Sequence, residues 1–409
     1  MSNLLAISGG TPVRDTKKDP WKMWPHRSSD EWDAKIEPLL REVYLSGHEG
    51  SGGAMIPRFS EKYAQYSGTK YGIFMPHGTE SISAALAGAL DLDGFSDGGE
   101  VIVPNYTFVA TASAVLERNC KVVFVDVCQD SFTIDPQAIA AAITPNTRAI
   151  LPVHLGGHPA DMGRLQEIAD KHALKIVEDC AQAHGAEYES KKVGSVGDVG
   201  AFSFQSSKNL TSGEGGMVTT DDKDIHDRVC AFMNVGRAPG GARWEYPRLG
   251  WNYRPSEYLA AILSVRLELL EEQTNLRNRN ALYLSSALDQ IDGITPPKHA
   301  NWVTKHGYHL YCMTYLPEGF GGKSRQEFAN ALSAEGIPCS AGYRSPLSGE
   351  PGMAHVAEKY PDRIRTLPCP NAEAVCRQSV WLFQNMLLGS KSDMDQIVGA
   401  ISKINEAWR

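Results

Sequence analysis

The chain has 409 residues, of which 42% are apolar and 22% are charged, a composition typical of soluble globular proteins. This length exceeds what one hydrophobic core usually supports, so we expect two domains. The net charge of −8, with no run of Lys and Arg to offset it, argues against a nucleic-acid-binding protein.

The cysteines and the apolar segments narrow the class of protein further. The eight cysteines are scattered singly, and no Cys-x-x-Cys pair suggests a zinc site or a disulfide framework, so we predict no metal. The apolar run at the N-terminus is too short for a signal peptide, and no apolar segment has the length of a membrane span. We therefore expect a protein with reduced thiols in the cytoplasm.

The first part of the chain is irregular and then helical. Residues 1–30 contain Trp21 and Trp24 and are interpreted as an arm that lies on the body of the protein. Apolar residues at helical spacing predict a helix over 29–44. The glycine-rich segment 47–53 is interpreted as a flexible connection, a mobile piece at a subunit boundary or a loop that cradles an anion.

From residue 71 short apolar runs alternate with helical stretches. Such alternation predicts an α/β fold with a mainly parallel sheet between helices, and ligands of these sheets bind at the carboxyl ends of the strands. The predicted strands are 73–75, 101–103, 122–125, 149–153, 175–177, 199–204 and 217–220, and the predicted helices are 79–90, 110–116, 136–142 and 162–172.

A long helix predicted over 255–276 leads toward the last third of the chain. Further helices are expected near 324–335 and 392–407. We therefore predict an N-terminal arm (1–30), a large domain (31–276) and a smaller C-terminal α+β domain (277–409).

Two residues indicate the chemistry of this protein. Lys208 follows a predicted strand in a Ser- and Gly-rich loop, and Asp179 ends an earlier apolar strand. Taken singly, the lysine is a solvated surface residue and the aspartate a helix N-cap. Together, an amine for a Schiff base and a carboxylate for a pyridinium nitrogen are what pyridoxal 5′-phosphate (PLP) requires of a protein.

Other strand ends offer contacts to the same cofactor. Gly78 and Thr79 open a helix whose N-terminus would attract the phosphate, although Thr79 could also be a simple N-cap. Ser203 adds a hydroxyl, and Phe108 is either a ring that stacks on the pyridine or a core residue. Gln182 is placed to bond the ring hydroxyl. The nearby His184 is assigned either to the cofactor or to the core.

Several motifs together resemble the DegT/StrS family of PLP-dependent sugar and aminocyclitol aminotransferases, which have aminotransferase fold type I. The matching stretches cover nearly the whole chain, and weaker similarity points to the branch with 3-amino-5-hydroxybenzoate synthase and scyllo-inosose aminotransferases. The stretches are residues 78–79, 107–108, 152–156, 178–185, 203–216, 250–257 and 380–388.

The resemblance implies a homodimer with active sites at the subunit boundary. Asn252 matches a family asparagine that reaches the phosphate of the partner's cofactor, whereas its sequence context alone fits a turn. His77 departs from the small polar residue or asparagine that relatives often carry there, which puts a side-chain phosphate contact at this position in doubt.

The predicted function is amino transfer from L-glutamine or L-glutamate to a cyclic ketone, either a keto-cyclitol or a keto-sugar nucleotide, as in amino-sugar or antibiotic biosynthesis. The alternatives are a dehydratase or lyase on the same fold, a non-catalytic PLP-binding protein and an ordinary amino-acid aminotransferase. Family dehydratases replace the Schiff-base lysine with histidine, so Lys208 favours amino transfer. Arg237, Arg254 and Arg344 are candidates for the donor carboxylate, and none is assigned.

Overall fold

Eight strands form the large sheet in the computed structural model, which describes residues 4–242 and 244–409. Their order is β1-β9-β8-β5-β4-β2-β3-β14, and all neighbours are parallel except β9, which is antiparallel to both β1 and β8. The prediction of a mainly parallel sheet is thus confirmed. The strands are β1 (Tyr71–Met75), β2 (Glu100–Pro104), β3 (Lys121–Val125), β4 (Thr147–Ile150), β5 (Lys175–Asp179), β8 (Val199–Ser203), β9 (Gly216–Thr220) and β14 (Ile364–Thr366).

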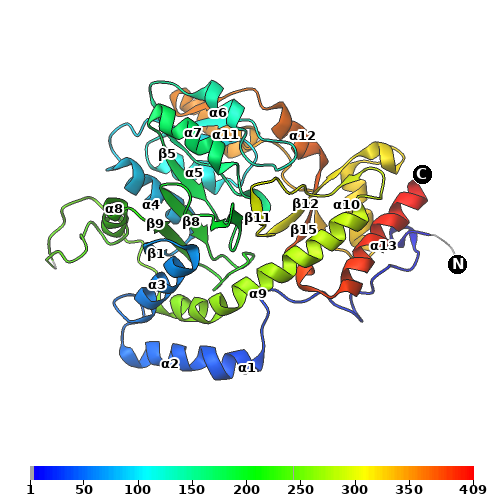
Figure 1. Ribbon diagram of the computed structural model, residues 1–409, viewed down its shortest axis with the longest axis horizontal. Coiled ribbons are helices and arrows are strands. Elements are labelled where there is room, and N and C mark those ends of the chain that lie inside the picture. Colours follow the sequence, from blue (N-terminus) through cyan, green and yellow to red (C-terminus); the bar gives the residue numbers. More distant parts are fainter. Residues whose placement is uncertain (1–3, 243) are drawn as a thin grey trace.

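Helices cover both faces of this sheet (Figure 1), because its strands are apolar on both sides. One face packs against α4 (Gly78–Leu90), α5 (Ala110–Glu117), α8 (Lys223–Met233), α11 (Pro351–Lys359) and α12 (Pro370–Gln378). The other face packs against α3 (Met55–Ser67), α6 (Pro136–Ala142), α7 (Met162–His172) and the first half of α9. The helices α4, α5, α6 and α7 correspond to the four predicted between strands.

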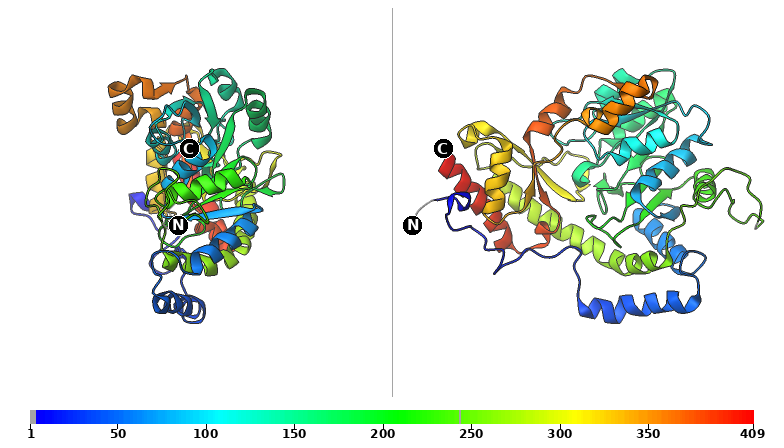
Figure 2. Two further views of the ribbon diagram at one scale, coloured as in Figure 1. Left: turned by 90° about the vertical axis from the view of Figure 1, so that its left-hand side faces the viewer. Right: turned by 180° about the vertical axis from the view of Figure 1, so that it is seen from behind.

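Helix α9 (Glu257–Leu288) connects this layered body to a second core (Figures 1 and 2). It begins at the N-cap Ser256, which accepts a hydrogen bond from Tyr258 N, and it continues well beyond the predicted end at residue 276. The apolar pattern fades at Arg277 and Asn278, yet Ala281, Leu284 and Leu288 further along are buried in the second core. The sequence pattern missed this part because polar residues interrupt its periodicity.

The second core lies around a four-stranded antiparallel sheet of order β10-β12-β15-β13. Its strands are β10 (Ile294–Thr295), β12 (Leu310–Tyr315), β13 (Cys339–Ser340) and β15 (Ser379–Phe383). The sheet packs against α10 (Arg325–Ala334) and α13 (Lys391–Trp408), which match the two predicted C-terminal helices. Each of these helices starts with a capping box, from Ser324 and Ser390 respectively.

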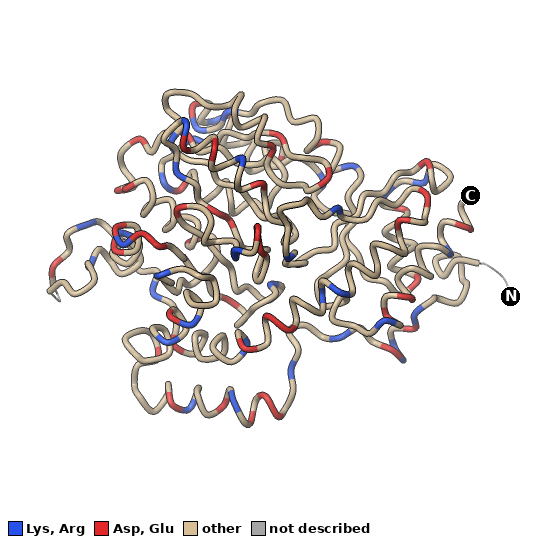
Figure 3. Tube along the Cα trace, viewed as in Figure 1, with Lys and Arg blue, Asp and Glu red and all other residues tan. Residues whose placement is uncertain are grey.

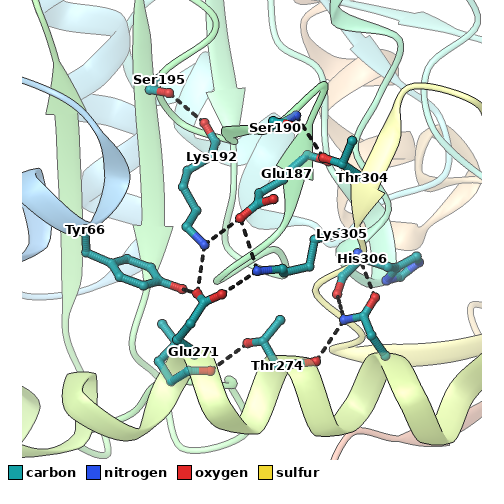
Figure 4. A network of polar contacts seen from close by, with 12 residues as sticks. Tyr66, Glu187, Ser190, Lys192, Ser195, Glu271, Thr274, Thr304, Lys305 and His306 are labelled. Carbon is teal, nitrogen blue, oxygen red and sulfur yellow. Dashed lines mark hydrogen bonds and ion pairs between the residues drawn. The ribbon is translucent and has the colours of Figure 1, made fainter.

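Contacts join segments on either side of the predicted boundary at residues 276 and 277. Strand β14 adds to the large sheet beside β3, and β11 (Val303–Lys305) pairs with the hairpin of β6 (Glu187–Tyr188) and β7 (Lys191–Lys192). Figure 4 shows the ion network at this hairpin, in which Glu271 of α9 accepts from both Lys192 and Lys305. The domain limits themselves remain a prediction.

The N-terminal segment lies along the second core and then reaches the large sheet. Arg14 contacts Asp393 of α13, Trp21 Nε1 donates to Gly336 O, and Trp24 Nε1 donates to Lys208 O at 3.0 Å. Residues 1–3 of the predicted arm lie outside the described residues. The next segment forms α1 (Ser29–Glu31), a π-helical turn (Trp32–Ile36) and α2 (Glu37–Ser46), close to the predicted helix 29–44.

The glycine-rich loop between α2 and α3 is anchored by a carboxylate of its own chain. Glu257, at the start of α9, accepts hydrogen bonds from the backbone N–H groups of Gly53, Met55 and Ile56 at 2.8–2.9 Å. The anion at this loop is therefore a structural side chain.

Charged residues of both signs are interspersed along the chain (Figure 3). Over the described residues, none of the helices combines the length and apolarity that crossing a membrane requires.

Candidate active site

The carboxyl ends of β1, β2, β5 and β8 meet at one edge of the large sheet and form the floor of a cavity of about 810 Å³. Because β5 and β8 are parallel neighbours, the ends that carry Asp179 and lead to Lys208 lie side by side. The cavity is lined by all predicted cofactor contacts except Asn252, namely Gly78, Thr79, Phe108, Asp179, Gln182, Ser203 and Lys208.

Asp179 is a buried carboxylate held in a fixed orientation. Its Oδ2 accepts from Thr111 Oγ1 at 2.8 Å and its Oδ1 accepts from Ala181 N at 3.1 Å. Burial raises the pKa of Asp179, against the opposing influence of these two hydrogen bonds and of Lys208. A cation placed beside this carboxylate would therefore offset the free-energy cost of burying its charge.

Lys208 lies in the loop after β8. Its backbone N–H donates to Gln205 O at 2.9 Å, and its carbonyl accepts from the indole of Trp24, so the backbone of the lysine is held from both sides. Burial lowers the pKa of the Lys208 amine below its ordinary value, although Asp179 acts to raise it. A larger fraction of neutral amine makes this lysine a better nucleophile and base than a surface lysine.

The N-terminus of α4 provides the donors for an anion. The N-cap residue is His77, which has an extended backbone and caps no N–H group with its side chain, so the first turn of the helix keeps its free donors. Thr79 is therefore not the N-cap. A Cβ on Gly78 would lie 2.5 Å from Ser203 Cβ, which shows how closely the helix start and the Ser203 hydroxyl converge.

Two further predicted contacts face the same cavity. Phe108 is 57% exposed, which excludes the core role that its apolar surroundings allowed. Gln182 Oε1 accepts from Gly156 N at 2.7 Å. The amide oxygen is thus occupied, and the NH₂ group, which also interacts with the Tyr343 hydroxyl, has a second N–H that can donate to a ligand.

Two of the remaining candidates, Asn252 and His184, lie away from the cavity. Asn252 is exposed and forms a β-bridge with Asn234, and it is absent from the described residues that line the cavity. His184 is a core residue: its Nε2 donates to Ser203 O at 2.7 Å, its Nδ1 accepts from Tyr63 OH, and burial lowers its pKa to about 3. His77, by contrast, lines the cavity, and its Nδ1 contacts Glu214, another lining residue, at 3.0 Å.

Sequence reasoning missed the residues that close the cavity opposite the sheet. Trp24 comes from the N-terminal segment and Tyr343 from the segment after β13. Trp381 belongs to β15 of the second sheet, Gln384 directly follows β15, and His309 directly precedes β12. These residues are far from the Lys and Asp motifs in sequence, and no local pattern links them to a site. The three arginines considered for the donor carboxylate are likewise not among the described residues that line the cavity.

A buried cluster behind the cavity has ligand atoms of the kind that bind metals. His154, Glu178 and Cys180 lie within reach of one another. However, His154 Nε2 contacts Glu178 at 2.9 Å and its Nδ1 accepts from Ala160 N, while Glu178 also accepts from three backbone N–H groups of residues 194–197. These hydrogen bonds occupy the ring and carboxylate atoms, so the cluster is structural.

Comparisons with known proteins agree with this geometry. The sequence profile of the DegT/DnrJ/EryC1/StrS aminotransferase family matches residues 30–402. The L-glutamine:2-deoxy-scyllo-inosose aminotransferase of Streptoalloteichus tenebrarius is 36% identical over 421 aligned positions, which cover 98% of this chain and 97% of the relative.

A second sequence relative and a solved structure are also similar to this chain. A second protein of Streptoalloteichus tenebrarius, provisionally named L-glutamine:3-amino-2,3-dideoxy-scyllo-inosose aminotransferase, is 36% identical over 422 positions, covering 99% of this chain and 98% of the relative. The crystal structure of 3-amino-5-hydroxybenzoic acid synthase superposes with a TM-score of 0.83 at 26% identity, covering 95% of this chain and 99% of that one.

Proposed function

The chain belongs to the DegT/DnrJ/EryC1/StrS aminotransferase family, and we propose that it uses PLP to transfer the amino group of L-glutamine to the ketone of a scyllo-inosose-type cyclitol. The family and the enzyme class predicted from the sequence motifs are confirmed. The observation that carries the proposal is the joint position of Asp179, Lys208 and the uncapped start of α4 at one cavity.

The residues of the cavity fit PLP in three independent ways. Asp179 is a buried carboxyl group whose pKa is raised by burial, so a protonated pyridine nitrogen beside it would stabilise its charged form. The free N–H donors of α4 and the Ser203 hydroxyl suit a phosphate, and Gly78 leaves the space that a side chain would fill. Lys208 supplies the amine that holds the aldehyde covalently.

When bound, PLP supplies an electron sink that makes the α-carbon of an amino acid acidic. Asp179 maintains that sink, since a carboxylate beside the ring nitrogen keeps the nitrogen protonated. Phe108 presents an aromatic face and Gln182 an NH₂ donor, and we assign them to the ring face and the ring hydroxyl. Asn252 remains a proposed contact to the cofactor of a partner subunit in a homodimer.

Lys208 also moves protons. Once its amine is free, Nζ removes a proton from the α-carbon of the amino donor, and in the second half of the reaction it returns a proton to the carbon that receives the amine. Burial favours this base role because it lowers the pKa of Lys208. The indole of Trp24, bonded to the backbone of Lys208, covers one side of the cavity and helps to exclude water.

The assignment of donor and acceptor rests on the curated relatives. Both are named for L-glutamine as donor and for a scyllo-inosose derivative as acceptor, and each alignment spans nearly the whole of both chains. The cavity of about 810 Å³ is large enough to hold a cyclitol or an amino acid beside the cofactor.

The test is a pair of half-reactions followed by visible absorbance. The holoenzyme should lose its yellow colour with L-glutamine, and 2-deoxy-scyllo-inosose should restore it. Borohydride reduction before the donor is added should leave the pyridoxyl group on Lys208. The Lys208→Ala variant should lose at least about 10²–10⁴-fold in rate, whereas Lys191→Ala, at an exposed position, should not. A yellow protein that no amino donor bleaches, or a tag on another lysine, contradicts the proposal.

A further inference from the structure

A buried cation lies behind the wall of the cavity. Arg277 of α9 is fully buried, and its Nε and Nη2 both donate to Gln384 Oε1, at 3.1 and 2.5 Å. Its guanidinium carbon lies 5.3 Å from the centre of the Trp24 ring, and its Nη1 has no hydrogen-bond partner among the described residues. A buried arginine is usually paired with a carboxylate, so this arrangement calls for an explanation.

The contact with Arg277 decides which way the Gln384 amide points. The two ends of a glutamine amide have nearly the same shape, and their orientation must be inferred from hydrogen bonds. A guanidinium has only donors, so the amide oxygen must face Arg277. Gln384 lines the cavity, and its Nε2 makes no hydrogen bond within the described part of the chain. The two N–H donors of this group are therefore left for a ligand.

A second chain of hydrogen bonds determines which ring nitrogen of His309 carries the proton. Asn209 Nδ2 donates to Gly307 O at 2.6 Å, so the Asn209 amide oxygen faces His309 Nδ1 at 3.3 Å. That oxygen can only accept, and Nδ1 therefore carries the proton. Burial, together with the charges of Lys208 and Arg277, lowers the pKa of His309 well below its ordinary value, so the ring is neutral. Its Nε2 is then a lone pair, and His309 also lines the cavity.

The strand register brings these two groups to the same end of one strand pair. His309 directly precedes Leu310 of β12, Gln384 directly follows Phe383 of β15, and Leu310 and Phe383 are antiparallel partners. Both side chains line the same cavity. A hydrogen-bond donor, Gln384 Nε2, and a hydrogen-bond acceptor, His309 Nε2, therefore both belong to the wall of this cavity.

We propose that Gln384 and His309 form a specificity subsite for a neutral group that accepts a hydrogen bond from Gln384 Nε2 and donates one to His309 Nε2, with Arg277 as the positioning residue. This inference rests on the proposed function. Two groups have this chemistry, the side-chain amide of L-glutamine and a ring hydroxyl of the cyclitol. A carboxylate can only accept, and its oxygens would face the lone pair of His309. A side-chain carboxylate is therefore disfavoured at the subsite, which selects against L-glutamate when the amino donor is the ligand that occupies it.

The experiment compares second-order rate constants of the separate half-reactions, with L-glutamine, with L-glutamate and with 2-deoxy-scyllo-inosose. In Gln384→Glu the new carboxylate still accepts from Arg277, which keeps the buried cation paired, but the two N–H donors are lost. In His309→Phe the lone pair of Nε2 and the Nδ1 contact to Asn209 are lost, and a flat aromatic side chain is kept. Gln326→Glu makes the same charge change at an exposed position and is the matched control.

We expect Gln384→Glu to lose at least about 10-fold in the half-reaction of the ligand that occupies the subsite, since a lost hydrogen bond and a new repulsion both act there. If the glutamine amide binds, His309→Phe also lowers the preference for glutamine over glutamate about 10-fold. If a cyclitol hydroxyl binds, the ketone half-reaction falls and that preference is unchanged. If both half-reactions slow down while the cofactor spectrum is unchanged, the glutamine amide and a cyclitol hydroxyl both bind at the subsite.

Two results overturn the subsite. One is a Gln384→Glu variant in which all half-reactions stay within about 3-fold of the wild type. The other is a uniform loss in all of them with an altered cofactor spectrum, which would mean a purely structural role. Failure of the proposed function looks different, because the wild type itself would then be bleached by neither amino acid.

Discussion

Replacing Gly78 by alanine tests whether the start of α4 and Ser203 form the phosphate site. The added Cβ would lie 2.5 Å from Ser203 Cβ and 3.0 Å from its Oγ, whereas ordinary contacts begin near 3.4 Å. The helix start and β8 must therefore separate by about 1 Å. A movement of this size misplaces the N–H donors of the first turn relative to the serine hydroxyl.

The cost can be estimated from the hydrogen bonds involved. Losing one hydrogen bond to a charged group costs about 1.5–3 kcal/mol, which corresponds to an increase of about 10- to 160-fold in the Kd for PLP. The Kd is measured by titrating the apoprotein with PLP and following absorbance, and thermal unfolding of the apoprotein shows whether the variant is folded. Gly352→Ala is the control, because a Cβ at this position in α11 has no atom within 4 Å.

A double-variant cycle separates the steric effect from other causes. Ser203→Gly removes the two atoms nearest to the new Cβ, and the third nearest, Ser203 Cα, lies at 3.2 Å. The variant with both substitutions should then bind PLP about as tightly as Ser203→Gly alone. Additive effects of the two substitutions, or a folded Gly78→Ala protein with a Kd within about 3-fold of the wild type, would refute the assignment.

Three further predictions concern pH. Because burial lowers the pKa of Lys208 and only the neutral amine reacts, covalent capture of PLP by the apoprotein should reach half its maximal rate below the ordinary lysine value of 10.5. Asp179→Asn removes the charge that raises this pKa and should shift the midpoint lower still, so a shift to higher pH would contradict the reasoning. Burial acts to raise the pKa of Glu271, but its two lysine partners (Figure 4) lower it to about 2. The ion network therefore stabilises the fold above pH 4.5, and this stabilisation is lost as the pH falls toward 2. In urea unfolding, Glu271→Gln should cost about 1 kcal/mol at pH 7, after allowance for solvent screening, and nothing near pH 2, whereas the exposed neighbour Glu272→Gln should have no effect at either pH. Burial lowers the pKa of His158 to about 4, so as the pH falls below 6.5 the unfolded chain takes up a proton before the folded protein does, and the fold loses stability. The Tm should therefore fall less between pH 6.5 and 4 in His158→Gln than in the wild type. Equal slopes of Tm against pH would exclude this contribution.

The parts of the protein that local sequence could predict are those in which neighbouring residues determine the structure. The strands that carry Asp179 and lead to Lys208 are short, apolar on both faces and separated by helices, and parallel sheets bury such strands between two layers. The rule that ligands bind at the carboxyl ends of these strands then brought Gly78, Phe108 and Gln182 to the same place. Each of these predictions needed only a segment and its immediate flanks.

What the sequence alone determined is therefore seven of the eight strands of the large sheet, the edge where ligands bind and the chemical groups along that edge, because apolar periodicity and the polar residues that follow each strand are local properties. The eighth strand, β14, was not predicted. Only the tertiary structure decided what faces that edge. Trp24 reaches it through packing of the N-terminal segment, and Arg277 is buried in a helix whose apolar pattern had already faded. His309 and Gln384 line the same cavity because the two distant strands that they adjoin pair with each other, and the orientation of each is set by a partner that no local pattern can identify.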